Sequence, residues 1–351
     1  MQVKNLLSGT VTESVQLHPA HSIPRVHSEK YQQSARISAC TENAGAEGFS
    51  NGPNPVQTPP TKMRGSSDDD ASVSVVNITP DVSCVLGEGP IYDERTDTLY
   101  FVDINTGLVM AIADVSSVVQ AGSEEGRVKL VFTSSPSPAS CMFLTSDPSK
   151  IVVGTNRDLM LVDMNDTDTD TDTEPGVDGS SRVLATLPDA IGATDKDARF
   201  NDGKVTPDGT ALVVGHLSLS WRTGPMGGLA AFDAGTKTFR DITPPQGIGC
   251  PNGIVWRNGK FLIVDSRDES IRSYAADEHG VPDTETNGVV SQTATGHANV
   301  PDGMALDADG NLWVAVAETG SVRCLDGERG NVLREVRLPV KRPTSCNFGE
   351  S

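Results

Sequence analysis

A short sequence pattern recurs along most of this chain. In each copy a polar residue precedes an apolar stretch, a turn and a second apolar stretch. The polar residues at the same phase of successive copies are Glu88, Ser140, Asn201, Asn252 and Asp302. Their separations are 52, 61, 51 and 50 residues, and the long interval contains an Asp/Thr-rich insertion, so the period is about 50 residues. A repeat of this length that holds several short strands is typical of a β-propeller blade.

Composition agrees with an all-β fold, since the 34 Gly and 22 Pro residues suit many short strands joined by turns. The pattern begins once more at Ser345, a few residues before the last residue, Ser351. We therefore expect a six-bladed β-propeller over residues 76–351, with its sixth blade truncated at the C-terminus. A propeller removes its exposed sheet edges only by closing its ring, which makes this truncation unusual.

Residues 1–75 show no sustained periodicity and end in a run of polar residues and prolines that includes Asp68, Asp69 and Asp70. Such a segment buries too little apolar surface to offset its ordering entropy, so we expect a disordered N-terminal extension. The Asp/Thr run at 166–174 lacks the glycine and glutamate positions of a calcium loop. We expect it to be a solvated loop between strands.

The net charge of −19 argues against nucleic acid as a partner, because phosphate binding needs a basic patch. No apolar stretch reaches the roughly 18 residues that span a membrane, and we expect no membrane partner. The six cysteines show no CxxC pair, so we expect reduced thiols in a cytoplasmic protein. A mitochondrial targeting role for the N-terminal extension stays open, and the sequence does not set the oligomeric state.

Residues at one phase of successive blades face a common channel, so Glu88, Asn201, Asn252 and Asp302 should converge. All four carry oxygen ligands and two are carboxylates, which suits a hard dication such as Ca²⁺ or Mg²⁺, with Mn²⁺ or Zn²⁺ as alternatives. Asn-Gly and Asp-Gly are also ordinary turn dipeptides, so each of the last three could be turn chemistry alone. Glutamate has no particular role in turns, which makes Glu88 the strongest of the four.

Four segments resemble the signature segments of the SMP-30/gluconolactonase/luciferin-regenerating (LRE-like) family. They are Gly87–Pro90, Arg199–Lys204, Pro251–Gly253 and Pro301–Met304, in the family's order and spacing. The resemblance covers about residues 80–351, and its most specific segment is Arg199–Lys204. It implies a six-bladed propeller that opens sugar lactones such as gluconolactone with one bound divalent cation.

The resemblance also implies roles for individual residues. Glu88, Asn252 and Asp302 match the family's metal ligands, and Arg199 and Asn201 match its substrate-binding pair. Asp302 also matches the residue that serves as general base. One cation beside a carboxylate suits lactone hydrolysis, which needs a polarised carbonyl and a deprotonated water. We therefore expect a lactonase with Ca²⁺ or Zn²⁺ as first candidates, and a small-molecule lactone as its partner.

The sequence departs from the family at residues 215–220, where an expected acidic residue is missing and His216 appears. We expect His216 to lie at the rim or behind the ligands rather than on the metal. This departure and the truncated blade favour a second hypothesis, a catalytically impaired calcium-binding propeller with a regulatory or scaffold role.

Overall fold

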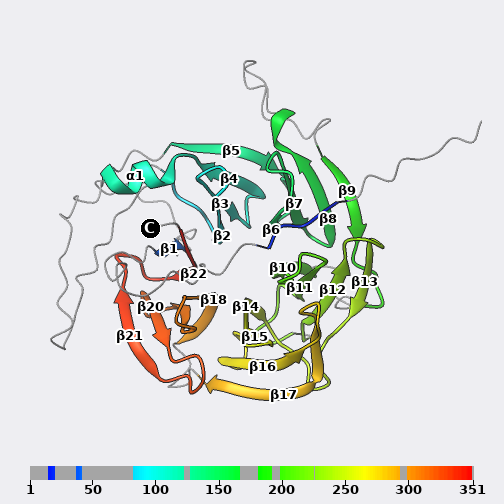
Figure 1. Ribbon diagram of the computed structural model, residues 1–351, viewed down its shortest axis with the longest axis vertical. Helices are drawn as coiled ribbons and strands as arrows, with labels where there is room; N and C mark the ends of the chain where they lie inside the picture. Colours follow the sequence, from blue (N-terminus) through cyan, green and yellow to red (C-terminus); the bar gives the residue numbers. More distant parts are fainter. Residues whose placement is uncertain are drawn as a thin grey trace, which may run out of the picture.

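The computed structural model describes residues 15–19, 37–41, 82–121, 127–166, 181–191, 198–224, 226–292 and 299–349. Within them, five four-stranded antiparallel sheets are arranged around a ring (Figure 1). In every sheet the strand order follows the chain, and the first strand lies innermost. This is the all-β propeller architecture that the 50-residue repeat predicts.

The blades follow one another in chain order. Blade 1 consists of β2 (Gly87–Asp93), β3 (Thr98–Asp103), β4 (Leu108–Ile112) and β5 (Val128–Thr133). Blade 2 consists of β6 (Ala139–Leu144), β7 (Lys150–Thr155), β8 (Asp158–Asp163) and β9 (Ser181–Thr186). Blade 3 consists of β10 (Arg199–Val205), β11 (Ala211–Leu217), β12 (Gly228–Asp233) and β13 (Thr238–Asp241). Blade 4 consists of β14 (Pro251–Arg257), β15 (Lys260–Asp265), β16 (Ser270–Ala276) and β17 (Pro282–Gln292). Blade 5 consists of β18 (Val300–Leu306), β19 (Leu312–Ala317), β20 (Ser321–Leu325) and β21 (Val332–Arg337).

Helical structure among the described residues is limited to α1 (Val115–Ala121), between β4 and β5, and a 3₁₀ turn, η1 (Met164–Asp166), after β8. No helix in the described ranges is long and apolar enough to cross a membrane. The expected solvated loop at 166–174 lies outside the described residues beyond Asp166.

Blade 3 packs its two faces against its two neighbours. In β11 every residue is buried, and alternate side chains point to opposite sides of the sheet. Val214 packs in a cluster with Phe143 of blade 2. Val213, the preceding residue, packs with Ile254 and Phe261 of blade 4. This two-sided burial explains why the second strand of a blade reads as a continuous apolar run.

Turns between strands follow the dipeptides seen in the sequence. Asn258 and Gly259 connect β14 to β15 as a two-residue hairpin loop flanked by the pair Arg257 and Lys260. Both turn residues have positive φ, 51° and 71°, as a type I′ turn requires. Asn tolerates this region and Gly adopts it without steric cost, so the Asn-Gly dipeptide fixes the hairpin register.

The expectation of a six-bladed propeller is wrong, because the described residues form five blades. The position between blades 5 and 1 holds a two-stranded sheet instead, in which β22 (Pro343–Phe348) pairs antiparallel with β1 (Ile37–Thr41). β22 therefore finds its partner in the N-terminal extension rather than in further strands of a shortened blade. Two strands cannot build the four-stranded layer that each of the other positions holds.

β22 is nevertheless anchored on both sides. The Thr344 hydroxyl donates a hydrogen bond to the Gly87 carbonyl of blade 1 at 2.6 Å, and the Asn347 amide donates to the Pro90 carbonyl at 2.8 Å. The Cys346 thiol contacts the Trp313 carbonyl of blade 5 at 3.3 Å. The ring is thus continuous around its inner circle.

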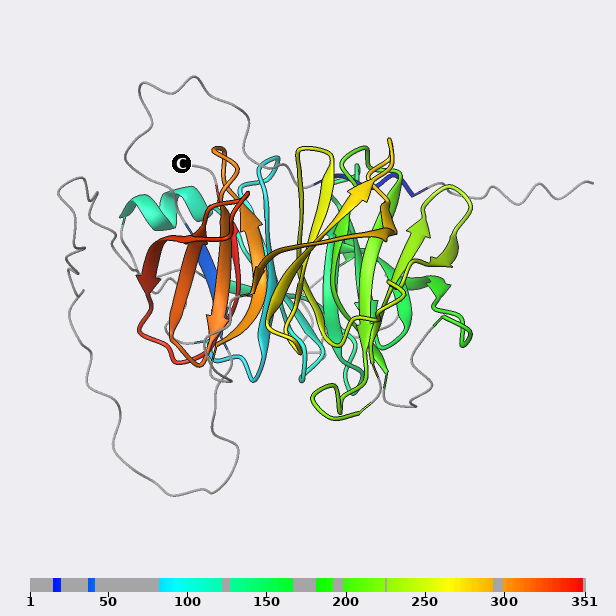
Figure 2. The same cartoon turned by 90° about the horizontal axis from the view of Figure 1, so that it is seen from below.

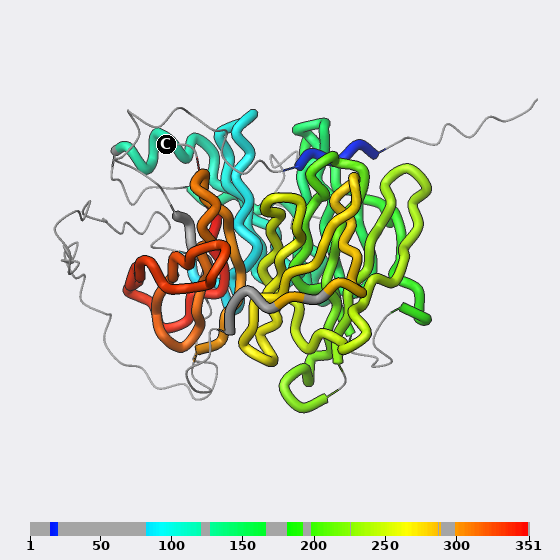
Figure 3. Tube along the Cα trace, turned by 60° about the horizontal axis from the view of Figure 1, so that its bottom comes forward, coloured from blue at the N-terminus to red at the C-terminus, as the bar shows by residue number. Residues whose placement is uncertain are grey.

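The N-terminal extension, for which we expected disorder, contains two described segments. One is β1, and the other is residues 15–19, which run along the face opposite the beginnings of the innermost strands (upper face in Figures 2 and 3). There Leu17 is 6% exposed and joins the core of blades 2 and 3, and the His18 amide donates to the Leu144 carbonyl at 3.0 Å. The other residues of 1–75 lie outside the described ranges.

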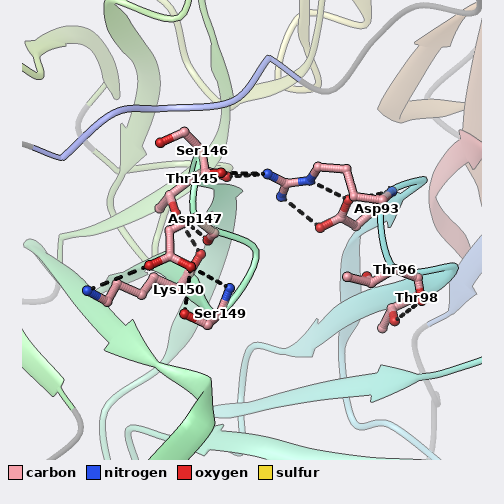
Figure 4. Close-up of polar contacts among 9 residues, drawn as sticks. Asp93, Thr96, Thr98, Thr145, Ser146, Asp147, Ser149 and Lys150 are labelled. Carbon is pink, nitrogen blue, oxygen red and sulfur yellow. Dashed lines mark hydrogen bonds and ion pairs between the residues drawn. The ribbon is translucent and has the colours of Figure 1, made fainter.

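Arg95 joins blades 1 and 2 on the same face (Figure 4). Its guanidinium pairs with the buried Asp93 carboxylate, with Nη2 and Oδ2 2.7 Å apart. Nη1 donates to the Thr145 carbonyl at 2.8 Å, next to the strand bridge between Thr145 and Leu17. This ion pair therefore supports the surface on which the N-terminal segment lies.

Candidate active site

The polar residues that mark the repeat lie at the beginnings of the innermost strands β2, β6, β10, β14 and β18. Each of these strands has a register shift at the marker. The shifts lie between Glu88 and Ile91, Ala139 and Cys141, Phe200 and Gly203, Asn252 and Ile254, and Pro301 and Met304. A β-bulge twists its strand and re-aims a side chain. The markers therefore meet at one end of the ring, on the lower face in Figure 2.

Three of the predicted residues form a hydrogen-bonded row across blades 3 and 4. The Arg199 guanidinium donates from Nη1 to Oδ1 of Asn201 at 2.7 Å. Nδ2 of Asn201 in turn donates to Oδ1 of Asn252 at 2.6 Å and to the Pro251 carbonyl at 2.8 Å. Asn201 and Asn252 are 6% and 5% exposed, so this row is held away from bulk water.

The row continues to blade 5 through a residue that the sequence did not indicate. Nδ2 of Asn252 donates to Oγ of Ser266 at 2.7 Å, and Ser266 donates to the Pro301 carbonyl at 2.6 Å. Pro301 directly precedes Asp302. Ser266 follows the last residue of β15, and no motif marked it. It fixes the orientation of the Asn252 amide.

Glu88 and Asp302 approach each other from blades 1 and 5. Burial raises the pKa of Glu88 well above its usual range, and the neighbouring charges of Asp302 and then Asp202 raise it further. The Gly89 amide donates to Oε2 of Glu88 at 3.0 Å, and Arg199 also opposes the rise. The carboxylates of Asp302 on blade 5 and Asp202 on blade 3 thus both act on Glu88 of blade 1.

Asp202 and Lys204 are two further charged residues at this site. Burial raises the pKa of Asp202 to about 6, against the opposing charges of Arg199 and Lys204. Burial also lowers the pKa of Lys204, whereas Asp202 raises it. Both residues belong to the Arg199–Lys204 motif. The sequence analysis assigned roles to Arg199 and Asn201 but not to Asp202 and Lys204. The motif does not show the β-bulge that turns neighbouring residues toward the channel.

The donor atoms fit a hard divalent cation. The set contains the Glu88 and Asp302 carboxylates and the Asn252 amide oxygen, and oxygen ligands are those that Ca²⁺ and Mg²⁺ prefer. In the part of the chain that the structure describes, no three His, Cys, Asp or Glu residues group as metal ligands, so a cation held here would also need the Asn252 oxygen. Burial raises the pKa of the adjacent Cys250 thiol, which stays neutral and offers no thiolate.

His216 lies behind the site, one of the two places expected for it. It pairs with Phe200 across β10 and β11, next to Arg199, and is only 3% exposed. Burial lowers the pKa of His216 to about 4, with a smaller contribution from Arg157 and an opposing one from Asp241. A Cβ atom at Gly228 would lie 2.6 Å from the ring, so glycine there leaves room for the imidazole.

Comparison with known proteins places these residues in a family. The family profile described as the SMP-30/gluconolactonase/LRE-like region matches residues 86–351. Regucalcin of Sus scrofa is 29% identical over 276 residues, which cover 76% of this chain and 80% of that protein.

Solved structures share the fold. A calcium-binding protein, regucalcin from Agrobacterium tumefaciens, is 23% identical and aligns with a TM-score of 0.61 over 76% of this chain and 80% of its own. A luciferin-regenerating enzyme is 24% identical and aligns with a TM-score of 0.59 over 74% of this chain and 78% of its own. The family match covers the whole ring and every predicted site residue, and the resemblance noted in the sequence is confirmed. The chain belongs to the SMP-30/gluconolactonase/LRE-like family.

Proposed function

We propose that this protein is a metal-dependent hydrolase that opens a lactone ring, with a sugar lactone such as gluconolactone as the first substrate to test. One divalent cation, Ca²⁺ or Zn²⁺ before Mg²⁺ or Mn²⁺, would be held by Glu88, Asn252 and Asp302. The observation that carries the proposal is the buried Glu88 carboxyl, which lies near Asp302 and beside the hydrogen-bonded row from Arg199 to Asn252. Membership of a family that includes gluconolactonases supports it.

The hydrogen-bonded row of Arg199, Asn201 and Asn252, called the polar row below, gives the substrate a fixed binding position. Arg199 donates from Nη1 to Asn201, to the Phe200 carbonyl and to the Ser140 hydroxyl. Its Nε and Nη2 have no hydrogen-bond partner among the described residues and can donate to a lactone carbonyl or a sugar hydroxyl. Asn201 is held between Arg199 and Asn252, so its position needs no rearrangement on binding. A preorganised donor costs no reorganisation when charge develops on the carbonyl oxygen.

Ring opening requires one proton to move twice. Asp302 accepts a proton as water attacks the carbonyl carbon, and the new C–O bond forms. The ring C–O bond then breaks, and its oxygen takes the proton from Asp302 to give a hydroxy acid. A bound cation supplies polarisation of the carbonyl and of the attacking water.

Ring opening followed by pH-stat tests the proposal directly, with purified protein before and after EDTA. We expect turnover of gluconolactone that disappears with EDTA and returns with one of the four cations. Asp302→Asn should lower kcat at least 100-fold, because general-base catalysis contributes about 10²–10⁴-fold. The matched control Asp309→Asn changes an exposed aspartate in the turn between β18 and β19 and should leave kcat unchanged. Equal rates for the two variants would contradict the proposal.

A second function, cation binding without turnover, is favoured by the two-stranded sheet at the sixth position, beside β2 and Glu88. Calorimetry separates the two functions. Saturable cation binding in a folded protein that opens no lactone supports the second, and absence of cation binding contradicts both.

A further inference from the structure

The loop that connects β11 to β12, described at residues 218–224, 226 and 227, lies on the same face as the candidate site. It begins directly after Leu217, which pairs with Arg199 at the beginning of β10. It projects beyond the ends of the blades on the lower face in Figure 2, where it is drawn in light green, and it projects likewise in Figure 3.

Both ends of the loop belong to blade 3, and the loop also contacts blade 4 and the connection that leads to it. The Gly227 amide donates to the Gly249 carbonyl at 3.3 Å. The Arg267 guanidinium donates to the Gly224 carbonyl at 3.1 Å. Met226 packs near Gly247, because a Cβ atom there would lie 3.3 Å from the methionine methyl carbon. Gly247 and Gly249 lie in the connection that leads to Asn252.

Internal hydrogen bonds give the loop a defined shape. The Ser218 and Ser220 hydroxyl oxygens are 2.9 Å apart, and Ser218 is fully buried. The Trp221 amide donates to the Ser218 carbonyl at 2.9 Å, and the Gly224 amide donates to the Ser220 carbonyl at 2.6 Å. The loop therefore presents its side chains from a fixed base.

Two of the exposed side chains of this loop are large and apolar, and they lie beside the exposed polar residues Ser220, Arg222 and Thr223. Leu219 is 62% exposed and Met226 is 42% exposed. Trp221 is half-buried, with the Arg222 guanidinium carbon 4.4 Å from its ring centre. No residue of 218–227 is acidic. An apolar group that packs on Leu219 and Met226 gains by leaving water.

We propose that this loop is the specificity element of the site and that the lactone opened here carries an apolar substituent, an alkyl chain or an aromatic ring, outside its lactone ring. The inference rests on the proposed function. The polar row holds the lactone ring in the channel, and the substituent packs against Leu219, Trp221 and Met226.

Two lactones with the same reacting ring test this inference. γ-Butyrolactone has no substituent, whereas γ-nonalactone carries a five-carbon chain. One methylene in an apolar pocket is worth roughly 10-fold or more in kcat/KM, so we expect kcat/KM for γ-nonalactone to exceed that for γ-butyrolactone at least tenfold. The double variant Leu219→Ser, Met226→Ser should lower this ratio at least fivefold and leave kcat/KM for γ-butyrolactone within twofold.

The matched control is Val332→Ser, Leu333→Ser, on the outer strand β21, where both side chains are more than half exposed. It should leave the ratio unchanged. A wild-type ratio near one, or a ratio that the loop variant does not change, overturns the inference while the proposed function stands. Absence of turnover with gluconolactone and both simple lactones overturns the proposed function and this inference with it. A concentration-dependent dimer that the loop variant abolishes assigns the apolar surface to self-contact and also overturns the inference.

Discussion

The buried imidazole of His216 shows how a residue behind the channel constrains the pH range of the fold. Its ring is 97% removed from solvent, and neither ring nitrogen has a hydrogen-bond partner among the described residues. A charged imidazolium in that place is costly, which is why burial lowers the pKa of His216 to about 4. The group is therefore neutral in the folded protein and gains a proton more readily in the unfolded chain.

This difference predicts a loss of stability in mild acid. The contribution of His216 is present above the unfolded pKa of about 6.5 and is lost as the pH falls from there toward about 4. Between pH 7 and 4.5, the free energy of unfolding of the wild type should fall by about 2–3 kcal/mol more than that of His216→Gln. Urea unfolding at several pH values measures this difference.

The exposed His279 is the control for that experiment. The Asp208 carboxylate raises the pKa of His279, with Nδ1 and Oδ2 2.8 Å apart. Its contribution has the opposite sign: it is present below pH 6.5 and is lost as the pH rises through the folded pKa. Between pH 7 and 4.5, the free energy of unfolding of the wild type should therefore fall less than that of His279→Gln, the opposite of the result expected for His216→Gln. Identical pH profiles for wild type and His216→Gln would contradict the explanation given for His216.

At residue scale, the sequence predicted the set that meets in the channel because residues at one phase of a closed repeat share one axis. Asn201 and Asn252 come together across two blades in this way, with Nδ2 of Asn201 2.6 Å from Oδ1 of Asn252. Ser266 could not be predicted in the same way, since it follows a second strand and reaches the site only through the Asn252 amide. The register shift between Phe200 and Gly203, which includes Asp202, could not be predicted either, because it is a property of the backbone geometry.

At element scale, the innermost strands and their hairpins were predictable, whereas the sixth position was not. Each inner strand follows a marker of the repeat, but residues 37–41 carry no marker, and their pairing with β22 is a contact between distant parts of the chain. Leu17 was missed for the same reason. A single apolar residue in a polar segment gives no periodic signal, although Leu17 reaches the core of blades 2 and 3.

β22 should stabilise the beginning of blade 1 through Thr344. Its hydroxyl is the donor to the buried Gly87 carbonyl, and valine has the same shape but no donor. A buried acceptor left without its partner costs about 1–3 kcal/mol, so Thr344→Val should lower the free energy of unfolding by that amount. Cation affinity should fall as well, because Gly87 directly precedes Glu88. Chemical denaturation and calorimetry measure the two effects.

The control for this prediction is Thr238→Val on the outer strand β13. Among the described residues, its hydroxyl has one hydrogen-bond partner, the exposed Thr236 hydroxyl at 2.8 Å. It should leave both stability and cation affinity within experimental error of the wild type. An equally small effect of Thr344→Val would show that β22 does not support blade 1.

At the scale of the whole molecule, the ring concentrates negative charge where its blades meet. The blades are held together by apolar packing between neighbouring sheets, but in the candidate site the charges of Asp302 and Asp202 both act on Glu88. Like charges in a buried site oppose folding, and a divalent cation offsets that cost. The stability of the ring should therefore be linked to the cation, even for strands far from the site.

This linkage predicts that the wild type and Glu88→Gln exchange their order of stability when the cation is added. A cation present at 100 times its Kd should raise the free energy of unfolding of the wild type by about 2.7 kcal/mol. Glu88→Gln removes a buried carboxyl whose ionisation is opposed by burial and by Asp302 and Asp202, so in EDTA this variant should be more stable than the wild type. It also removes a ligand, so added cation should stabilise it much less, and the order of the two proteins should reverse. Thermal unfolding in EDTA and in excess Ca²⁺ or Zn²⁺ measures both states. If the wild type were the more stable protein in EDTA, the carboxylates would not repel one another in the folded ring, and the cation would have no cost to offset there.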